Sequence, residues 1–476
     1  MTVYYKLFLD GEWVSGKSEL SIINPANLTH AAKVAMVSAE QLDLALLSAS
    51  SAFARWKSTP ASKRGDYLCR AAKILETKIR TVSLATCREQ GKPVFEAIGE
   101  LQRAVETLQW CGENAERLCA AIPMEGARLK VPEPLGVVAA FTPWNYPAVI
   151  SARKVAAPLA AGCPVILKAA EESPACAVAI IEALDEAGIP KGVVNLVFGD
   201  PPFISETLMS SESVRVVSFT GSTAVGKQLA RKAADNLQQC VLELGGHAPV
   251  LIFSDADLPR AAKEISDYKF ETAGQSCNAP SRIFVEASVY EDFLMEFQRV
   301  VNEISVGNGE DPATTMGPMI GQRAIDRMEN LKRDALERGA KAIEYSGQMP
   351  ESGYFWRPTI LTNVAPEARV MWEEPFGPLV PVLPFDTLDE AVQLANASDY
   401  GLAAYVFSTS EDIQKKIVKS LNVGSISINM LRGVRADVIN PGIGNSGYGY
   451  EGGDEGFRAF QNLKLVNGSM PTLDLE

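Results

Sequence analysis

Between residues 135 and 236, short apolar runs alternate with longer amphipathic segments, and this alternation constrains the fold more than any other feature of the chain. The runs are rich in Val, Ile and Leu, as expected of strands buried on both faces. Repeated strand–helix alternation predicts a mostly parallel, doubly wound sheet of the nucleotide-binding kind. The expected strands are 135–141, 163–168, 192–198 and 214–219, and the expected helices are 147–162, 173–188, 202–210 and 222–236.

The helix expected at 173–188 carries its own boundary signals. Ser173 is the expected N-cap, Pro174 occupies the first helical position, and Gly188 stops the helix. The sequence therefore predicts both ends of this element.

Two further regions complete the predicted α/β class. Residues 37–117 are expected to be rich in helix, and a second α/β series begins at Pro249. This second series contains expected helices at 293–307 and 323–340, an expected strand at 424–429, and ordered loops near the functional site at 309–319 and 433–449.

Charge and apolar patterning narrow the partners. The 476 residues include 45 basic and 58 acidic side chains, a net charge of −13 with a pI near 5.0, so nucleic acid and anionic membranes are not expected partners. The most apolar long segment, 149–167, contains Arg153 and Lys154 and is broken by proline and glycine, which makes it a poor membrane span. The first sixteen residues lack the pattern of a signal peptide.

Cysteine and histidine usage excludes several kinds of chemistry. The eight cysteines contain no C-x-x-C pair and are expected to be reduced thiols in a cytoplasmic protein. His30 and His247 are the only histidines, so a zinc site built on several histidines is excluded and no metal is expected. A Cys–His or Ser–His hydrolytic pair would have to use one of these two residues.

The stretch FETAGQSCNAP contains Cys277 among small and amide residues. A buried cysteine is more often inert than reactive, and nothing basic adjoins this one in sequence. Cys277 is therefore a candidate nucleophile only if other motifs support it.

The stretch GSTAVGKQ, residues 221–228, resembles a phosphate-binding loop but has Gln228 where a magnesium-binding Ser or Thr would stand. A glycine-eased turn is the simplest alternative. Because the stretch follows a predicted strand, a helix N-terminus facing a pyrophosphate, with Ser222 offering its hydroxyl, is favoured.

Two more stretches follow predicted strands. In LELGGHAP, Glu243 precedes paired glycines, which suggests that something approaches the backbone closely. Most glutamates at strand ends are solvated, but Glu243 would be able to activate water if Cys277 forms a thioester. In FTPWNYP, Asn145 is either a turn residue or an amide aimed at an oxyanion.

Taken together, these motifs resemble the aldehyde dehydrogenase superfamily over nearly the whole chain. The stretches that carry the resemblance are LFLDGEWV, INPA, FTPWN, KAAEESP, GIPKGVVNLVFGD, SFTGSTAVGKQLA, LELGGHAPV, GQSC, GPMI, RPTIL, EEPFGP, YGLAAYVFS and NSGYGYEGG, in the family's order. The resemblance is closest to succinate-semialdehyde and α-ketoglutarate-semialdehyde dehydrogenases.

The resemblance implies an NAD(P)-dependent oxidation of an aldehyde to a carboxylic acid. Cys277 would attack the carbonyl to give a thiohemiacetal, and Asn145 with the Cys277 N–H would hold the oxyanion. Glu243 would activate the water that hydrolyses the thioester. Lys154 and Glu451 match the family's proton-relay pair.

The resemblance also implies a cofactor site. Lys168 and Glu171 would contact the adenosine ribose, Gly221 and Ser222 the pyrophosphate, and Glu374 the nicotinamide ribose. Because the Glu171 carboxylate would repel a ribose phosphate, NAD is expected as the cofactor, with NADP as the alternative. The other positions implied to contact the cofactor are Thr142, Trp144, Asn145, Ala170, Leu244 and Phe376.

The expected substrate residues depart from the semialdehyde pattern. Arg153 matches an arginine that binds the substrate carboxylate in some members, but Glu271 replaces the usual second arginine. Arg432 or Arg435 would be able to substitute as an anion clamp, and both are equally well explained as surface residues. The substrate is therefore a semialdehyde such as succinate semialdehyde or, alternatively, a neutral aliphatic or aromatic aldehyde.

The presence of Glu243, Cys277 and Asn145 disfavours two other functions within the same superfamily. Members that form acyl-CoA lack the glutamate at position 243, and a non-catalytic structural homologue would be free to lose Cys277, Glu243 or Asn145. The family fold implies an NAD(P)-binding domain at 1–120 and 138–245, a catalytic domain at 246–440, and an oligomerisation arm at 121–137 and 455–476. Such an arm implies a homodimer or homotetramer.

Overall fold

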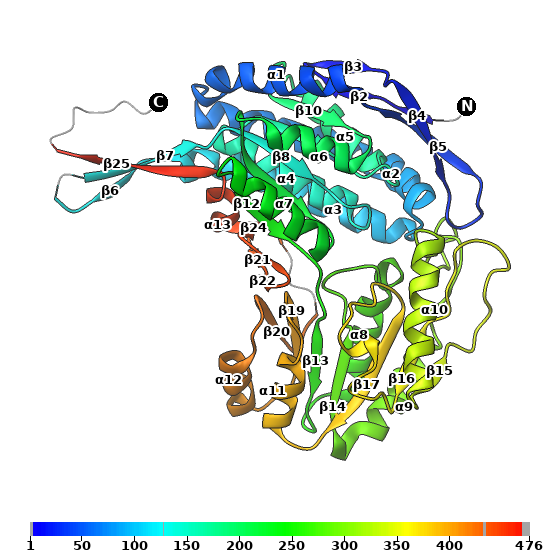
Figure 1. Ribbon diagram of the computed structural model, residues 1–476. Helices are drawn as coiled ribbons and strands as arrows, with labels where there is room; N and C mark the ends of the chain where they lie inside the picture. The colour runs from blue at the N-terminus through cyan, green and yellow to red at the C-terminus, as the bar shows by residue number, and fades with distance from the viewer. Residues whose placement is uncertain (1–2, 127, 432–434, 469–476) are drawn as a thin grey trace.

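The structure is a computed structural model that describes residues 3–126, 128–431 and 435–468. It contains two large α/β layers, one above the other, and a narrow β arm that projects from the upper layer (Figure 1). The α/β class predicted from the sequence is confirmed.

The upper sheet has the strand order β23-β12-β11-β8-β9-β10-β2-β3. Its central strands, from β12 to β10, pair in parallel and are almost wholly buried, which explains their continuous apolar sequences. The strands are β2 Leu7–Leu9, β3 Glu12–Val14, β8 Val137–Phe141, β9 Val165–Lys168, β10 Val194–Val197, β11 Val214–Thr220, β12 Gln239–Glu243 and β23 Gly447–Tyr448.

Strand order reverses beside β8. The chain runs outward from β8 through β9 to β10, and then returns to add β11 and β12 on the other side of β8. In open α/β sheets, ligands bind outside the carboxyl ends of the strands at this reversal point. The segments that begin at Thr142, after β8, and at Gly221, after β11, lie at that point.

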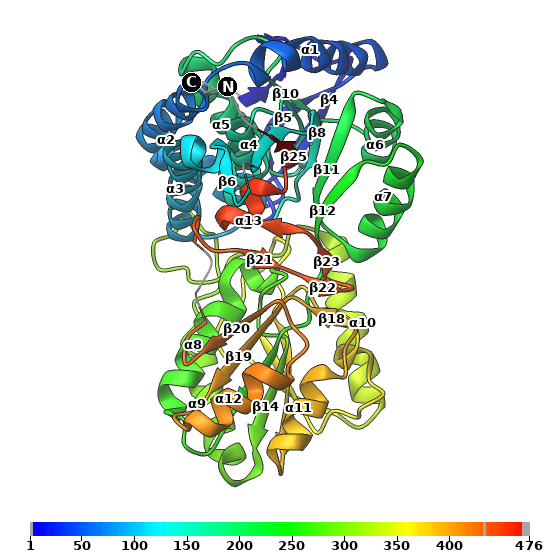
Figure 2. The ribbon, with the colours of Figure 1, turned by 90° about the vertical axis from the view of Figure 1, so that its left-hand side faces the viewer.

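Helices cover both faces of the upper sheet, with α4 and α5 on one side and α6 and α7 on the other (Figure 2). The helices of this layer are α1 Ala39–Lys57, α2 Ala61–Gln90, α3 Val94–Cys119, α4 Pro147–Ala161, α5 Ala175–Glu186, α6 Pro201–Ser210, α7 Thr223–Asp235 and α13 Gly453–Arg458. Within the described residues, no helix is both long enough and apolar enough to cross a membrane.

The start of α5 differs from the prediction, and its end agrees with it. The N-cap position is Pro174, and the Ser173 hydroxyl donates to the Trp144 carbonyl at 3.1 Å, so Ser173 was wrongly predicted as the cap. A carbonyl from the loop after β8 binds this hydroxyl, which local sequence does not reveal. Gly188, with φ of 84°, lies just past the helix and donates to the Asp185 carbonyl, as a helix stop should.

The lower sheet has the order β15-β16-β17-β14-β13-β19-β20 and is parallel apart from β15. Its strands are β13 Pro249–Ile252, β14 Arg282–Glu286, β15 Lys341–Glu344, β16 Thr359–Thr362, β17 Leu379–Phe385, β19 Ala403–Phe407 and β20 Ser425–Ile428. Its helices are α8 Leu258–Phe270, α9 Tyr290–Val301, α10 Gln322–Glu337, α11 Leu388–Asn396 and α12 Glu411–Ser420, with short 3₁₀ turns η1 Glu271–Gly274, η2 Ala287–Val289 and η3 Arg369–Met371.

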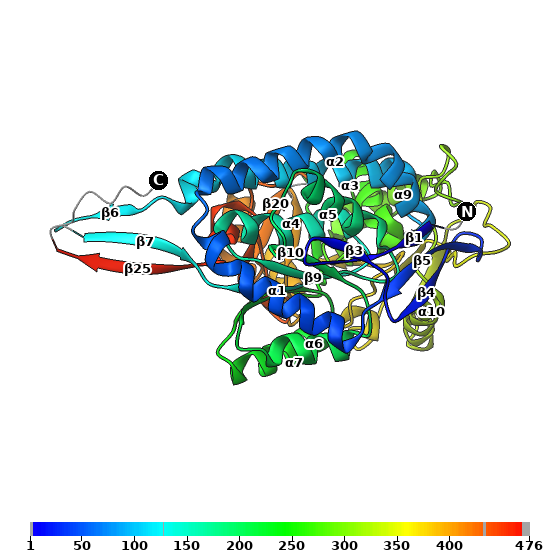
Figure 3. The same cartoon turned by 90° about the horizontal axis from the view of Figure 1, so that it is seen from above.

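The arm is a three-stranded sheet of order β25-β7-β6 that extends away from the body (Figure 3). Its strands are β6 Ile122–Met124, β7 Arg128–Pro134 and β25 Gln461–Asn467. Strands from the two expected arm segments, 121–137 and 455–476, thus pair with each other.

Short strands connect the two layers. The loop predicted at 433–449 contains short strands in its second half: the segment 440–451 forms β21 Asn440–Pro441, β22 Ile443–Gly444, β23 and β24 Tyr450–Glu451. Because β23 joins the edge of the upper sheet while β22 pairs with β18 Tyr400–Gly401, this segment ties both layers together. A separate sheet at the N-terminus contains β1 Val3–Tyr5, β4 Ser18–Ile23 and β5 His30–Met36.

Candidate active site

A cavity of about 130 Å³ lies where the upper sheet, α4 and the loop after α8 meet. Segments from both layers contribute, so the site exists only when the two layers are assembled. The cavity is lined by Arg103, Asn145, Tyr146, Val149, Ile150, Arg153, Glu243, Tyr268, Glu271, Ser276, Cys277, Asn278, Asn440 and Glu451.

Cys277 and Glu243 are in direct contact in this cavity. The Cys277 thiol donates to Glu243 Oε1 at 3.0 Å. Burial, followed by the Glu243 charge, holds the pKa of the Cys277 thiol well above its ordinary value. Burial and the Glu451 charge raise the pKa of Glu243, whereas the bond from Cys277 lowers it. The thiol therefore keeps its proton at rest, with a carboxylate placed to accept it.

The loop before Cys277 is conformationally demanding. Thr272 and Ala273 have φ of 51° and 54°, a region that side chains other than glycine rarely adopt. Glu96 on α3 holds Thr272 by accepting its N–H at 2.9 Å and its hydroxyl at 3.2 Å. Gly274 has φ of 73°, and a Cβ there would lie 2.4 Å from the Gly377 carbonyl oxygen. The backbone conformation of the loop before Cys277 is thus stabilised by Glu96 and constrained by the Gly377 carbonyl.

The glycine pair after Glu243 has a specific explanation. A Cβ on Gly246 would lie 2.1 Å from the carbonyl oxygen of Cys277, and one on Gly245 would lie 2.9 Å from Glu374 Oε2. The group that approaches this backbone closely is therefore the Cys277 segment itself. The glycines allow the two candidate catalytic residues to come together.

Asn145 also lines the cavity and lies in the turn between β8 and α4. Its side-chain Nδ2 donates to the Gln275 carbonyl at 3.0 Å, and the residue is 4% exposed. An amide nitrogen carries two hydrogens, so one remains for a ligand. Asn145 and Cys277 both line the cavity, as an oxyanion site would require.

Behind Glu243 lies a buried ion pair. Lys154 Nζ on α4 pairs with Glu451 of β24 and donates to the Ser218 hydroxyl at 3.1 Å. The Lys154 side chain is 0% exposed. Because the charges of Lys154 and Glu451 shift the pKa of Glu243 in opposite directions, the three groups are electrostatically linked.

Of the arginines expected to bind the substrate, Arg153 lines the cavity and Arg435 does not. Arg153 lines the cavity, donates to the Arg435 carbonyl at 3.4 Å, and has a buried Nε without a partner among the described residues. Arg435 itself is exposed, pairs with Asp437 at 3.1 Å, and is not among the lining residues. Arg432 lies outside the described residues.

Glu271 also lines the cavity, but a residue that the sequence did not suggest opposes its charge. Arg103 of α3 approaches Glu271 Oε1 to 3.9 Å and lines the same cavity. Nothing local marks Arg103, because its partner follows it by more than 160 positions and the contact forms only when α3 packs beside η1.

The expected cofactor residues gather at the strand-order reversal. Thr142 and Trp144 follow β8, while Gly221 and Ser222 follow β11. Ser222 is the N-cap of α7 and accepts the Val225 N–H at 3.4 Å. A helix N-terminus at this point suits a pyrophosphate.

Three further positions border that region. Trp144 packs edge-on against Phe376 at 5.8 Å between ring centroids. Glu374 accepts the Gly246 N–H at 3.0 Å, and burial raises its pKa to about 7. Leu244 is 5% exposed and packs against α7, where a Cβ on Gly226 would lie 2.4 Å from it.

The remaining expected cofactor residues follow β9. Ala170 is buried, and Lys168 Nζ lies 2.8 Å from Glu171 Oε2. Glu171 Oε1 accepts the Gly199 N–H at 2.8 Å. Both oxygens of the Glu171 carboxylate therefore have partners, and its charge remains at the end of β9.

A thiol hydrogen-bonded to a carboxylate, beside the reversal point of a doubly wound sheet, is the arrangement expected of a dinucleotide-dependent oxidoreductase. The comparisons identify the family more closely. The family model described as "Aldehyde dehydrogenase family" matches residues 13–466.

Individual relatives agree over nearly their full lengths. The chain is 40% identical to 4-(hydroxymethyl)benzenesulfonate dehydrogenase TsaD1 of Comamonas testosteroni, covering 98% of this chain and 99% of the relative. It is 34% identical to succinate-semialdehyde dehydrogenase [NADP(+)] GabD of Escherichia coli, covering 96% of each. The solved structure of betaine aldehyde dehydrogenase from Staphylococcus aureus with NAD+ has a TM-score of 0.93 and 32% identity, covering 98% of this chain and 95% of that chain.

The chain belongs to the aldehyde dehydrogenase family. It is an NAD(P)-dependent oxidoreductase that acts on an aldehyde group.

Proposed function

We propose that this enzyme oxidises a small aldehyde carrying an anionic group to the carboxylic acid, with Cys277 as the nucleophile. The observation that carries the proposal is the 3.0 Å contact between Cys277 Sγ and Glu243 Oε1 at the cavity. The remaining roles follow from what surrounds that contact.

The first step joins the substrate to the enzyme. As Cys277 Sγ attacks the carbonyl carbon, Glu243 accepts the thiol proton. The carbonyl oxygen becomes an oxyanion, which Asn145 Nδ2–H and the Cys277 backbone N–H stabilise. Because both donors are held in place beforehand, they need little reorganisation during attack.

The segments after β8 and β11 suit the cofactor, because a helix N-terminus and the strand-order reversal coincide there. Bound NAD(P)+ supplies the hydride acceptor that turns the thiohemiacetal into a thioester. Thr142, Trp144, Gly221 and Ser222 would hold it, with Glu374 beside the glycine pair.

Hydrolysis then releases the acid. Once the proton taken from Cys277 has left Glu243, the carboxylate accepts a proton from a water molecule, which adds to the thioester carbon, and the thiolate of Cys277 leaves. Lys154 and Glu451 interact electrostatically with Glu243, and they provide a buried route along which its proton can leave. Cysteine suits this sequence because its thiolate both attacks and departs readily.

Arg153 supports an anionic substrate. Arg153 lines the cavity, its Nε has no partner in the part of the chain that the structure describes, and a buried cation of this kind favours a carboxylate or sulfonate. Arg103 opposes the charge of Glu271, so Glu271 does not cancel Arg153. Two relatives are named for a benzenesulfonate and for succinate semialdehyde, and both compounds carry an anionic group.

The cavity also limits substrate size. Its 130 Å³ is comparable to the roughly 150 Å³ that holds a benzene ring in an engineered protein cavity. Tyr146 and Tyr268 line it, which favours an aromatic ring or a chain of a few carbons. A neutral aromatic aldehyde is the second candidate, because the tyrosines would serve it equally well.

NAD is the proposed preferred cofactor. The Glu171 carboxylate at the end of β9 disfavours a 2′-phosphate, and its pairing with Lys168 reduces that effect without removing the charge. NADP is therefore expected to work more weakly rather than not at all.

The roles of the larger units are part of the proposal. Residues 1–120 and 138–245 would bind the cofactor, 246–440 would carry the nucleophile, and 121–137 with 455–476 would mediate a homodimer or homotetramer. Exposed Leu463 and Leu465 on β25 support a partner on the arm. The eight cysteines are all free, which agrees with a cytoplasmic location.

One assay tests the proposal: cofactor reduction by purified enzyme with NAD+ and NADP+ over succinate semialdehyde, 4-sulfobenzaldehyde, benzaldehyde and linear aldehydes. We expect the anionic aldehydes and NAD+ to give the highest kcat/KM. Cys277→Ala should fold and bind NAD+ but reduce none of it. Normal turnover by that variant would refute the mechanism, and a preference for neutral aldehydes would refute the role of Arg153.

A further inference from the structure

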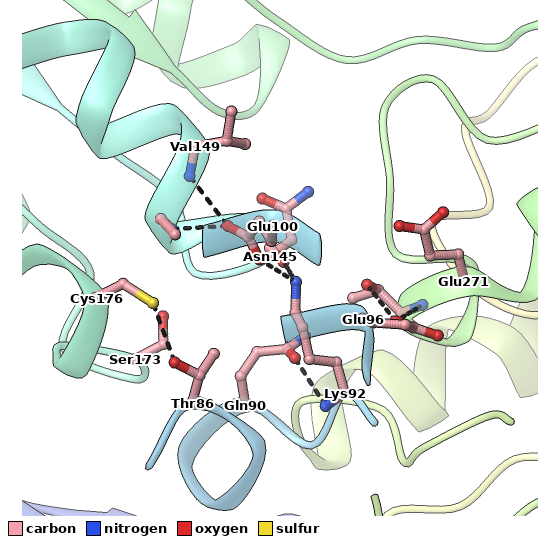
Figure 4. A network of polar contacts seen from close by, with 12 residues as sticks. Thr86, Gln90, Lys92, Glu96, Glu100, Asn145, Val149, Ser173, Cys176 and Glu271 are labelled. Atoms are coloured by element: carbon pink, nitrogen blue, oxygen red, sulfur yellow. Dashed lines mark hydrogen bonds and ion pairs between the residues drawn. The ribbon is translucent and has the colours of Figure 1, made fainter. Parts of the chain in front are cut away.

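The turn that carries Asn145 rests on a buried lysine–glutamate pair that none of the steps above uses (Figure 4). Lys92 lies between α2 and α3, and Glu100 lies on α3. Their side chains are 0% and 1% exposed, and Lys92 Nζ is 2.6 Å from Glu100 Oε2. Because burying such a pair costs desolvation free energy, the pair alone is weak evidence for stability. Its other contacts show what it does.

Lys92 contacts the turn at Asn145 itself. Its Nζ donates to the Asn145 carbonyl at 2.8 Å and lies 4.3 Å from the centre of the Tyr146 ring. The backbone of Asn145 is thereby held by a cation, while its side chain is held by the Gln275 carbonyl.

Glu100 contacts the end of the same turn. Its Oε1 accepts the N–H groups of Ala148 and Val149 at 2.7 and 3.2 Å. Tyr146 occupies the N-cap of α4 and supplies no side-chain bond to that helix. Glu100 therefore replaces the missing cap from a different helix, and its charge suits the helix N-terminus.

We propose that Lys92 and Glu100 are positioning residues that hold Asn145 at the distance the oxyanion requires, an inference that rests on the proposed role of Asn145. The pair acts on the turn as a clamp, with Lys92 bound to the Asn145 carbonyl and Glu100 bound to the first amides of α4. The same α3 helix supplies Glu96, which holds Thr272 in the loop before Cys277. One helix thus supports both walls of the oxyanion site.

A purely structural role would give a different result from a positioning role. A structural pair would stabilise the fold whether or not Asn145 were present. A positioning pair acts through Asn145, so its effect on turnover should disappear when the Asn145 amide is removed.

The first variant is Lys92→Met, which removes the cation and keeps the side-chain length. We expect kcat for cofactor reduction to fall by about 100-fold, the usual cost of a misplacement near 1 Å. The KM for NAD+ and the rate at which iodoacetamide alkylates Cys277 should stay within threefold, because alkylation forms no oxyanion. The matched control is Lys78→Met, which breaks a surface pair of α2 with Glu182 and Glu186 and should change none of these values.

The decisive measurement is the double variant Asn145→Ala/Lys92→Met. In the Asn145→Ala background, we expect Lys92→Met to lower kcat by less than threefold. A full 100-fold further loss would overturn the proposal, and so would wild-type turnover by folded Lys92→Met. Normal turnover by Asn145→Ala alone would instead refute the proposed function, so the two failures are distinguishable.

Lys92→Met leaves Glu100 buried without its cation and is expected to lower thermal stability. If that variant does not fold, Lys92→Met/Glu100→Gln provides the same test, because the glutamine oxygen still accepts the Ala148 N–H and no buried charge remains. The expected kcat loss and its disappearance in the Asn145→Ala background are the same. Full activity of this neutral pair would overturn the clamp.

Discussion

Two buried lysines have different surroundings: Lys154 lies on α4, and Lys92 contacts the turn before that helix. Lys154 pairs with Glu451 and a serine hydroxyl, and both charges shift the pKa of Glu243. Lys92 pairs with Glu100 and bonds to a backbone carbonyl. Lys154 and Glu451 act on the charge of Glu243, so we expect them to affect its proton, whereas Lys92 and Glu100 both bond to backbone groups, so we expect them to fix geometry. The same ion pair chemistry thus serves two different purposes on either side of one cavity.

The largest effect is expected from changing Glu243, the carboxylate whose pKa Lys154 and Glu451 shift. Glu243→Gln removes the acceptor of the thiol proton and the base for hydrolysis, so kcat should fall by about 1,000-fold, within the usual range for general bases. Steady-state cofactor reduction measures it. Glu182→Gln, a surface change on α5, is the control and should leave kcat unchanged. Retention of a tenth of the activity would show that Glu243 is not the base.

The second prediction separates the two lysines by pH. Glu243 must be ionised to act, and its pKa is raised, so kcat/KM should fall as the pH drops through that raised pKa. Because Lys154 lowers the pKa of Glu243, Lys154→Met should move this acid limb to higher pH. Lys92→Met should lower kcat without moving the limb. Equal shifts in both variants, measured between pH 5 and pH 9, would abolish the distinction.

The third prediction concerns Arg153, which precedes Lys154 on α4 but faces the cavity. Arg153→Met should reduce kcat/KM for 4-sulfobenzaldehyde and succinate semialdehyde by about 30-fold, the equivalent of a charge-assisted hydrogen bond of ~2 kcal/mol. Benzaldehyde should change by less than threefold and serves as the internal control. An equal loss for all three aldehydes would assign Arg153 to structure instead of recognition.

The smallest effect concerns a buried carboxylate whose recorded partners are a hydroxyl and an amide instead of a lysine. Glu89 bonds to Tyr5 and to the Ala175 N–H, and burial raises its pKa to about 8. The folded state therefore binds more protons than the unfolded state between the ordinary pKa of about 4.5 and pH 8, and the free energy of unfolding falls as pH rises through this window.

Glu89→Gln should remove that contribution, so thermal unfolding should depend less on pH between 5 and 8, by a few kcal/mol at most, on the order set by 1.4 kcal/mol per pKa unit. Melting curves at several pH values measure it, with Glu182→Gln as the surface control. An unchanged pH dependence would mean that Glu89 does not bind a proton in the folded state.

The sequence by itself determined the α/β class and most elements of the doubly wound sheet, because apolar periodicity is a local property that can be read from neighbouring residues alone. It also singled out Cys277, Glu243 and Asn145, which lie in short motifs next to predicted strands and resemble those of one family. The structure then placed these three around one cavity.

Only the tertiary structure decided the rest. Arg103 meets Glu271, and Lys92 meets Asn145, across separations that no local pattern records. The Ser173 hydroxyl donates to the Trp144 carbonyl after β8 instead of capping α5. Gly246 is explained by the Cys277 carbonyl, which lies too close to leave room for a Cβ. Local propensity specifies which element forms, but the partner of a buried charge or hydroxyl is chosen by packing, because such a group must be satisfied by whatever the folded chain brings within reach.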